Sequence, residues 1–129
     1  MIEQGIVSLL NANAPLMATI NRCIYPVFVP QDASYPCLSY QVISTTASYD
    51  FQGESTTESR IQFDAWAEDY MNCKTIQKAL RAVIDAYDGV LSEGTRVLGA
   101  FRSLETDFFE PDSRMYRALS EYTFHYVEP

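Results

Sequence analysis

In the stretch Ser59-Arg-Ile-Gln-Phe-Asp-Ala-Trp-Ala67, every second residue from Ile61 onward is apolar. This alternation is the signature of a β-strand with one apolar face. The stretch that follows, Tyr70-Met-Asn-Cys-Lys-Thr-Ile-Gln-Lys-Ala-Leu-Arg-Ala-Val-Ile-Asp-Ala-Tyr87, has a different period, because its apolar residues recur at steps of three and four. Such spacing places them on one side of an α-helix. We therefore expect a strand and a helix that covers the apolar face of that strand.

Both ends of this helix carry recognisable signals. Asp69 is a suitable N-cap, and Gly89 is predicted to adopt the left-handed conformation that ends many helices. Lys74, Lys78 and Arg81 recur on the side away from the apolar residues. We expect them to lie on an exposed helix face or, in a sharper interpretation, to contact an acidic neighbouring subunit.

The rest of the chain shows weaker patterns. A short amphipathic helix is predicted over residues 2–10, and a second helical segment over residues 16–20 with Pro15 in its first turn. Strands are predicted over residues 36–44, 96–105 and 116–127, with a short edge strand at 24–25. A turn is predicted at residues 107–113, where Glu110-Pro-Asp112 breaks the strand pattern.

Residues 45–58 show neither period and are interpreted as a long irregular connection. Connections of this length inside a compact domain tend to be functional or disordered. Tyr49 and Phe51 lie in the middle of the segment, and two aromatic side chains on a polar loop are poorly hidden in a monomer. We expect another protein to cover them; alternatively, the loop folds back on its own sheet.

Together these elements predict an α+β fold, with an antiparallel sheet of about four strands, one long helix packed on it and a short N-terminal helical region. The chain has 129 residues, and no linker divides it. We therefore expect a single domain over residues 1–129.

The charge balance is acidic. The formal net charge is -8 at pH 7, and Arg22 is the one basic residue before Arg60. Such a surface repels phosphate, so specific binding of nucleic acid is not expected. An acidic wall that DNA passes without sticking would suit this sign, although the same charge would also simply keep a small protein in solution.

The cysteine pattern and hydropathy limit the other classes of protein. Cys23, Cys37 and Cys73 form no CxxC pair, and His125 is the sole histidine, so a zinc site is not expected. The odd number of cysteines and the lack of a signal peptide indicate reduced thiols and synthesis in the cytoplasm. No apolar run approaches the ~18 residues of a membrane span, so we expect no membrane contact.

No arrangement of nucleophile, base and metal ligands is visible, so we expect neither an enzyme nor a cofactor. His125 is expected at the surface or edge of the last strand. Glu105, Asp107, Glu110 and Asp112 form an acidic cluster that lacks the spacing of a calcium-binding loop. This cluster is more typical of a solvated turn.

Several short motifs occur in a fixed order along the chain. They are Ile24-Tyr-Pro26, Tyr35-Pro36 opening Leu38-Ser-Tyr-Gln-Val-Ile-Ser44, Gln62-Phe-Asp-Ala-Trp-Ala67 before the helix, and Phe109-Glu-Pro111 followed by Tyr116-Arg117. In this order and spacing, from about residue 2 to 127, the chain resembles the small tail-completion proteins of tailed bacteriophages and prophages. The matching positions are mainly scaffold: Tyr25, Pro36, Tyr40, Phe63, Trp66, Tyr116 and Phe124. Residues 45–58 carry no motif that matches.

The resemblance implies a structural protein, similar to tail terminators, that has no catalytic residues. Such proteins assemble with copies of themselves into a ring, typically a hexamer, which caps the tail tube protein and docks onto the head connector or adaptor protein. DNA would pass through the channel without specific binding. The protein would be assembled in the host bacterial cytoplasm and reside in the virion tail at the head-tail junction.

Ring closure requires two different complementary patches on each subunit. We expect them in residues 45–58, on the basic helix face and in the acidic cluster, the last two being one candidate pair. The candidate interface residues are Tyr49, Asp50, Phe51, Glu54, Lys74, Lys78, Arg81, Glu105, Asp107, Glu110 and Asp112. Two alternatives stay open: a head-tail adaptor or other minor tail protein, and a small cytoplasmic ligand-binding domain or enzyme with a pocket between helix and sheet.

Overall fold

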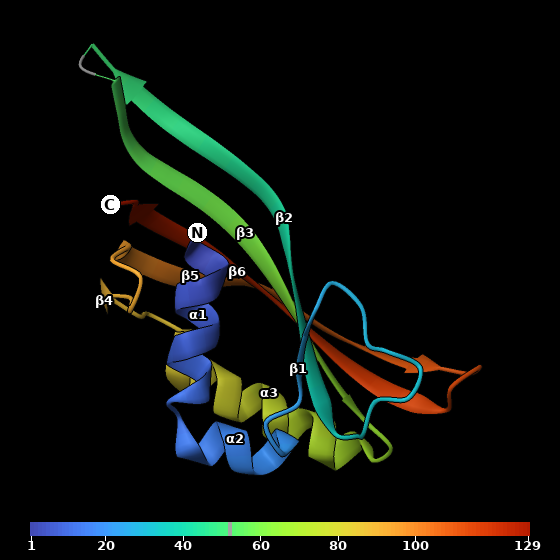
Figure 1. Cartoon of the computed structure of the whole chain (residues 1–129). Coiled ribbons are helices and arrows are strands. Elements are labelled where there is room, and N and C mark those ends of the chain that lie inside the picture. The colour runs from blue at the N-terminus through green and yellow to red at the C-terminus, as the bar shows by residue number, and fades with distance from the viewer. Residues whose placement is uncertain (52) are drawn as a thin grey trace.

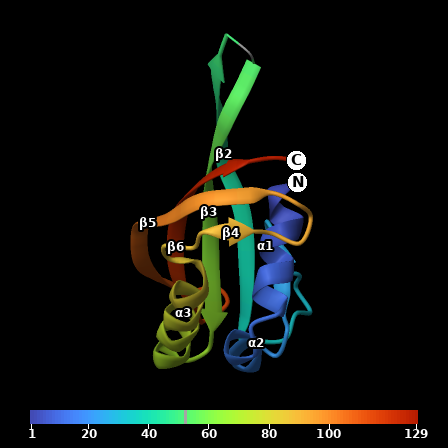
Figure 2. The ribbon, with the colours of Figure 1, turned by 90° about the vertical axis from the view of Figure 1, so that its left-hand side faces the viewer.

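The computed structural model describes the backbone of residues 1–51 and 53–129, and the side chains of residues 1–49, 51 and 56–129. Its helices are α1 (Ile2–Asn11), α2 (Ala14–Ile20) and α3 (Tyr70–Ile84). Its strands are β1 (Ile24–Pro26), β2 (Cys37–Asp50), β3 (Gly53–Ala67), β4 (Gly89–Val90), β5 (Arg96–Glu110) and β6 (Met115–Val127). The strands form one twisted sheet, and the helices lie on one side of it (Figures 1 and 2).

The sheet is larger than predicted. Its order is β1-β2-β3-β6-β5-β4, with β1 parallel to β2 and all other neighbours antiparallel. The α+β class and the four long antiparallel strands are confirmed, but the sheet has six strands and is mixed. Segments as short as β1 and β4 cannot display a period, which is why the sequence pattern does not predict their pairing.

The core lies between the sheet and the helices. The alternating residues of the middle strand are buried as predicted, and Phe63 packs edge-on against Tyr122 with 6.0 Å between ring centres. Cys73, Ile76 and Leu80 of α3 cover this part of the sheet. The apolar residues of α1 and α2 complete the same core, including Leu10, Leu16 and Ile20.

The two ends of α3 differ in how well the sequence predicted them. Asp69 is the N-cap as expected, because its Oδ1 accepts a hydrogen bond of 3.0 Å from the N–H of Met71. The prediction for Gly89 is wrong, since this residue lies in β4. The left-handed conformation falls instead on Ala86, with φ of 60°, whose N–H donates to the carbonyl of Ala100 at 2.8 Å. That bond to β5 turns the chain away from the helix axis before Gly89 is reached.

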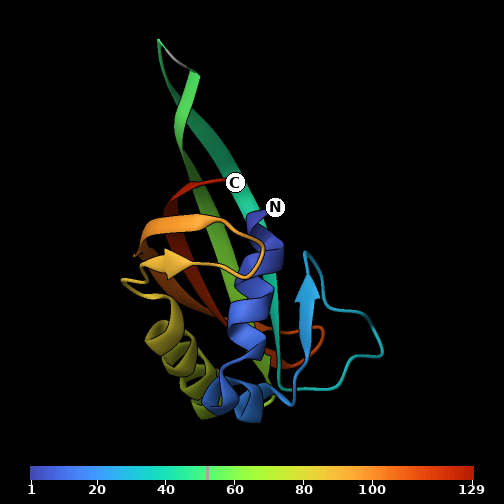
Figure 3. The same ribbon diagram turned by 60° about the vertical axis from the view of Figure 1, so that its left-hand side comes forward.

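The predicted irregular connection at residues 45–58 is also wrong. β2 and β3 remain paired as far as Asp50 and Gly53. β6 joins β3 only from the Thr57–Tyr126 pair onward, so the outer part of the hairpin has no third strand beside it. This part leaves the sheet as a two-stranded ribbon (Figures 1 and 3). We call residues 47–56 the arm.

A further correction concerns the predicted turn at residues 107–113. β5 continues through Glu110, well past the predicted end at 105, because its residues pair with β6 as far as Glu110 and Met115. The turn itself is shorter and is closed by the N–H of Arg114, which donates to the carbonyl of Glu110 at 2.8 Å. Glu105, Asp107 and Glu110 are therefore strand residues. In the described part of the chain, no helix is long and apolar enough to cross a membrane.

Candidate assembly surfaces

The arm carries two exposed aromatic side chains. Tyr49 is 73% exposed, and Phe51 is fully exposed where the chain turns from β2 toward β3. The side chains of Asp50 and Glu54 lie outside the described residues; their backbones are placed at the end of β2 and in β3 opposite Tyr49. Aromatic rings held away from the core are poorly placed in an isolated subunit. This geometry makes the arm a candidate contact with another protein.

The basic helix face and most of the acidic cluster meet within one chain. Nζ of Lys74 lies 3.0 Å from Oδ1 of Asp107, and the guanidinium of Arg81 donates to both carboxylate oxygens of Glu105 at 2.8 and 2.9 Å. The hydroxyl of Tyr70 also donates to Asp107 at 3.0 Å. These bonds attach α3 to β5. The groups are thus neutralised inside the subunit, which leaves them less charge to offer to a neighbour.

The remaining charged candidate residues lie apart from the bonds between α3 and β5. Glu110 forms an ion pair of 3.4 Å with Arg117 on the opposite face of the sheet. Lys78 and Asp112 are exposed and form no ion pair within the described residues. Contact of any of these residues with a second subunit stays a prediction.

The outer face of the sheet, away from the helices, holds a cluster that the sequence patterns did not reveal. The guanidinium of Arg117 lies 4.4 Å from the ring centre of Phe108 and 5.4 Å from that of Trp66. Such placement over aromatic rings is favourable for a cation. The indole N–H of Trp66 donates to the hydroxyl of Ser39 at 3.1 Å. The only sequence signal was the pair of motifs that contain Trp66 and Arg117, which gave no indication that the two side chains would meet.

Two carboxylates are buried on the same outer face. Glu121 is paired with Arg60, at 2.6 Å from its guanidinium. Asp64 has fewer polar partners. Its Oδ2 accepts a hydrogen bond of 2.8 Å from Gln62. Its Oδ1 lies 4.0 Å from Arg117 and accepts no hydrogen bond in the described residues. Burial raises the pKa of Asp64, and the amide of Gln62 and the charge of Arg117 offset part of that rise.

We predict that Asp64→Asn increases the free energy of unfolding at neutral pH relative to the wild type. The cost of burying the ionised carboxylate is absent below its unfolded pKa and fully present above its raised folded pKa. The advantage of Asn should therefore shrink as the pH is lowered through this window. Urea unfolding of both proteins at about pH 7 and about pH 4 measures the difference. Asp112→Asn, at an exposed position, controls for the loss of one negative charge. An equal difference at both pH values would contradict the prediction.

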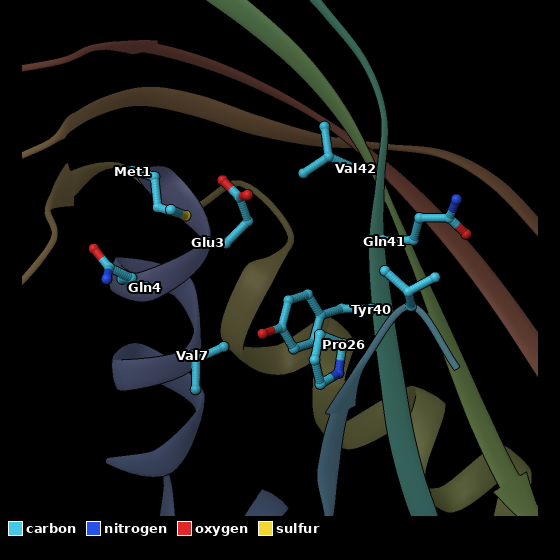
Figure 4. A pocket seen from close by; sticks show the side chains of 9 residues that line it. Met1, Glu3, Gln4, Val7, Pro26, Tyr40, Gln41 and Val42 are labelled. Atoms are coloured by element: carbon cyan, nitrogen blue, oxygen red, sulfur yellow. The ribbon is translucent and has the colours of Figure 1, made fainter. Parts of the chain in front are cut away.

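An open groove of about 630 Å³ lies beside the edge of the sheet, between α1 and β2 (Figure 4). The side chains of Val7 and Tyr40 point toward one another across it, and Glu3 is the one carboxylate among its lining residues. Elsewhere in the described chain, no group of three or more histidine, cysteine or acidic residues is placed to hold a metal ion.

The profile of the family described as tail completion protein gp17 matches residues 4–126. The chain belongs to this family. The resemblance seen in the motifs is thereby confirmed, and the tail completion protein is a structural protein of a phage tail.

The fold of this tail completion protein also occurs in a solved particle. A chain from the structure described as "Virion of native gene transfer agent (GTA) particle" superposes with a TM-score of 0.78. The alignment covers 92% of this chain and 89% of that chain, at 17% sequence identity. At this identity the likeness is one of fold. A search of curated proteins gives no match.

Proposed function

We propose that this tail completion protein forms a closed ring of identical subunits, six in number, at the end of the tail tube. The ring ends the growth of the tube and joins the tail to the head connector. The observation that carries the proposal is the arm, which holds Tyr49 and Phe51 out from the sheet in a protein of this family. The gene transfer agent chain supports it, since a protein with the same fold is part of a virion.

In this proposal the whole chain, residues 1–129, acts as one tail-terminator-like domain. Its arm contacts the tail tube protein, and the sides of the domain contact its neighbours in the ring. Assembly takes place in the bacterial cytoplasm, and the finished ring lies at the head-tail junction of the virion.

The acidic charge suits a ring that DNA must pass through. Each chain has a net charge of -8, and a ring repeats that charge with every subunit. Any share of it on the inner rim repels the phosphates of the passing DNA. Salt screens this repulsion over about 8 Å at physiological ionic strength, so it acts close to the rim. DNA therefore moves through the channel without binding.

The proposal is tested by the mass of the purified protein in solution, measured alone and with the purified tube protein. We expect six copies to associate, either alone or only on the end of the tube. A mass that stays that of one chain at every concentration, with and without tube protein, would contradict the ring.

Electron microscopy of particles that lack the protein separates termination from adaptor function. Overlong tails are expected if the protein ends tube growth. Tails of normal length beside unjoined heads would instead assign it the role of a head-tail adaptor.

A further inference from the structure

One edge of the sheet is open along half of β2. β1 pairs with β2 only through Leu38, Ser39 and Tyr40. After the N–H of Val27 donates to the carbonyl of Tyr40 at 2.7 Å, the chain turns away with a φ of 65° at Val27. From Gln41 to Ala47, the described residues place one strand beside β2, which is β3. We call residues 41–47 the β2 edge.

The opposite edge of the sheet is open along half of β5. β4 covers only Arg96 and Val97, and Ala86 donates to the carbonyl of Ala100. From Phe101 to Glu110, the described residues place β6 alone beside β5. We call residues 101–110 the β5 edge. Figure 2 shows how short β4 is beside the long β5.

The β2 edge lacks the prolines and charges that usually protect a free strand edge, and the charges of the β5 edge are paired within the subunit. Proteins commonly block such edges with proline or with charged side chains that deter a second strand. The β2 edge contains no proline and no charged residue. The β5 edge has four charged residues, but each forms an ion pair within the subunit: Glu105 with Arg81 and Arg102, Asp107 with Lys74, and Glu110 with Arg117. Each edge also has one irregularity in its pairing with the inner strand, between Val42 and Ser44 and between Arg102 and Leu104. The β5 edge also exposes four apolar side chains: Phe101, Leu104, Phe108 and Phe109.

The two edges are matched in direction. β2 runs antiparallel to β3, β3 to β6 and β6 to β5, so β5 is antiparallel to β2. A rotation about an axis that runs roughly along the strands preserves strand direction. In a ring with such an axis, the β5 edge of one subunit therefore meets the β2 edge of the next subunit as an antiparallel pair.

The two edges are also staggered in a complementary way. The β2 edge lies in the half of the sheet nearer the arm, whereas the β5 edge lies in the half that contains Ala67 and Tyr116. A closed ring allows no displacement of a subunit along its axis, so pairing the two edges requires the strands to tilt relative to that axis. Tilted, staggered strands are the geometry that closes a sheet into a barrel.

We propose that residues 101–110 of one subunit pair with residues 41–47 of the next, so that the sheets of the ring join into one continuous antiparallel sheet. This inference rests on the ring proposed above. It supplies the two different patches that a head-to-tail ring needs, because the two edges belong to opposite sides of each subunit. Each edge pairs with the opposite edge strand of a second copy of this chain.

The groove beside β2 fits this arrangement. Gln41 and Val42, the first residues of the β2 edge, are among its lining residues. Phe109 lies on the helix side of β5, where its ring centre is 5.0 Å from that of Tyr116. When β5 of the neighbouring subunit pairs with β2, the residues on the helix side of that β5 face the groove. Phe109, 46% exposed in the isolated subunit, is the apolar side chain on that side that the groove can cover.

Disulfide cross-linking tests the pairing. Thr46 lies on the outer face, since its neighbour Thr45 bonds to Ser59 on the helix side. Leu104 and Thr106 share that outer face with Phe108, which contacts Arg117. We combine Thr46→Cys with Leu104→Cys, Thr106→Cys or Phe108→Cys in turn, which scans the possible registers. Cross-strand pairs lie close enough for disulfide formation in an antiparallel sheet.

The native cysteines leave little background for this experiment. Cys23 is half-buried and is replaced by Cys23→Ser. Cys37 and Cys73 are buried, and burial raises the pKa of their thiols to about 12 and about 11, which keeps them protonated and unreactive. The matched control combines Thr45→Cys with Leu104→Cys, because Thr45 lies one residue away on the opposite face.

In the oligomer formed alone or on the tube, at least one Thr46 pair is expected to give a ladder of covalent oligomers on a non-reducing gel. The Thr45 control is expected to stay at the mass of one chain. Oligomers that form but show no cross-link for any Thr46 pair would overturn the edge pairing and leave the ring standing. Equal cross-linking of the control would also overturn it. If no oligomer forms under either condition, the ring itself fails, and this inference fails with it.

Discussion

Replacing residues 48–56 with an Asn-Gly turn is expected to leave the protein folded and to abolish the joining of tails to heads. The removed part of the hairpin lies beyond the first β3–β6 pair, at Thr57 and Tyr126, so it takes no part in the three-stranded sheet. The core residues of β3 begin closer to the helices. An Asn-Gly turn suits a tight hairpin, and shortening a surface connection changes stability little.

Folding and assembly of the shortened protein are measured separately. Circular dichroism and urea unfolding should give a free energy of unfolding within about 1 kcal/mol of the wild type. Complementation of phage that lack the protein should give heads and tails that remain unjoined. Infectious particles at the wild-type level would remove the arm from the proposed mechanism.

A milder variant tests whether the aromatic rings are the part of the arm that matters. Tyr49→Ser combined with Phe51→Ser keeps the length of the hairpin and removes both rings. We expect it to reduce joining strongly. The matched control is Met71→Ser, which removes an apolar side chain that is 66% exposed on α3, away from the arm. Its particles should be normal.

Phe63→Ala is expected to cost about 3–5 kcal/mol of the free energy of unfolding. Phe63 is 1% exposed and packs against Tyr122 at the centre of the core, so the truncation leaves a cavity that the surrounding strands cannot close. A loss of this size is a large part of the stability of a small domain. Urea unfolding measures it directly.

The matched control for Phe63→Ala is Phe101→Ala, which removes the same ring from the exposed face of β5. It should change the free energy of unfolding by less than about 1 kcal/mol. Similar losses for both variants would mean that Phe63 does not lie in the core as described.

The sequence predicted best the elements that have one buried face. The period of α3 and the alternation around Phe63 both arise from burial against the core, and both are present in the structure. The arm was missed for the same reason. The side chains of the arm that the structure describes are exposed or half-buried, so they need no alternation, and only the β-branched Thr45, Thr46, Thr56 and Thr57 hinted at strands.

The sequence identified the charged candidate site residues, but it did not show which residues they pair with. The sequence singled out Lys74 and Arg81 as basic and Glu105 and Asp107 as acidic, but it could not show that α3 and β5 bring them together in one subunit. Such pairing depends on how elements distant along the chain pack. The cluster of Arg117 with Trp66 and Phe108 was missed because its members come from three strands.

The continuity of β3 has a mechanical consequence. This strand runs without a break from Gly53, at the end of the arm, to Ala67 beside the helices, and β2 and β6 flank its inner part. A pull on the end of the arm moves β2 and β3 together, so it loads the hydrogen bonds between β3 and β6 in shear, all at once, and does not peel them apart one by one. In the proposed ring, such a strand would resist tension along the tail axis without help from the helices.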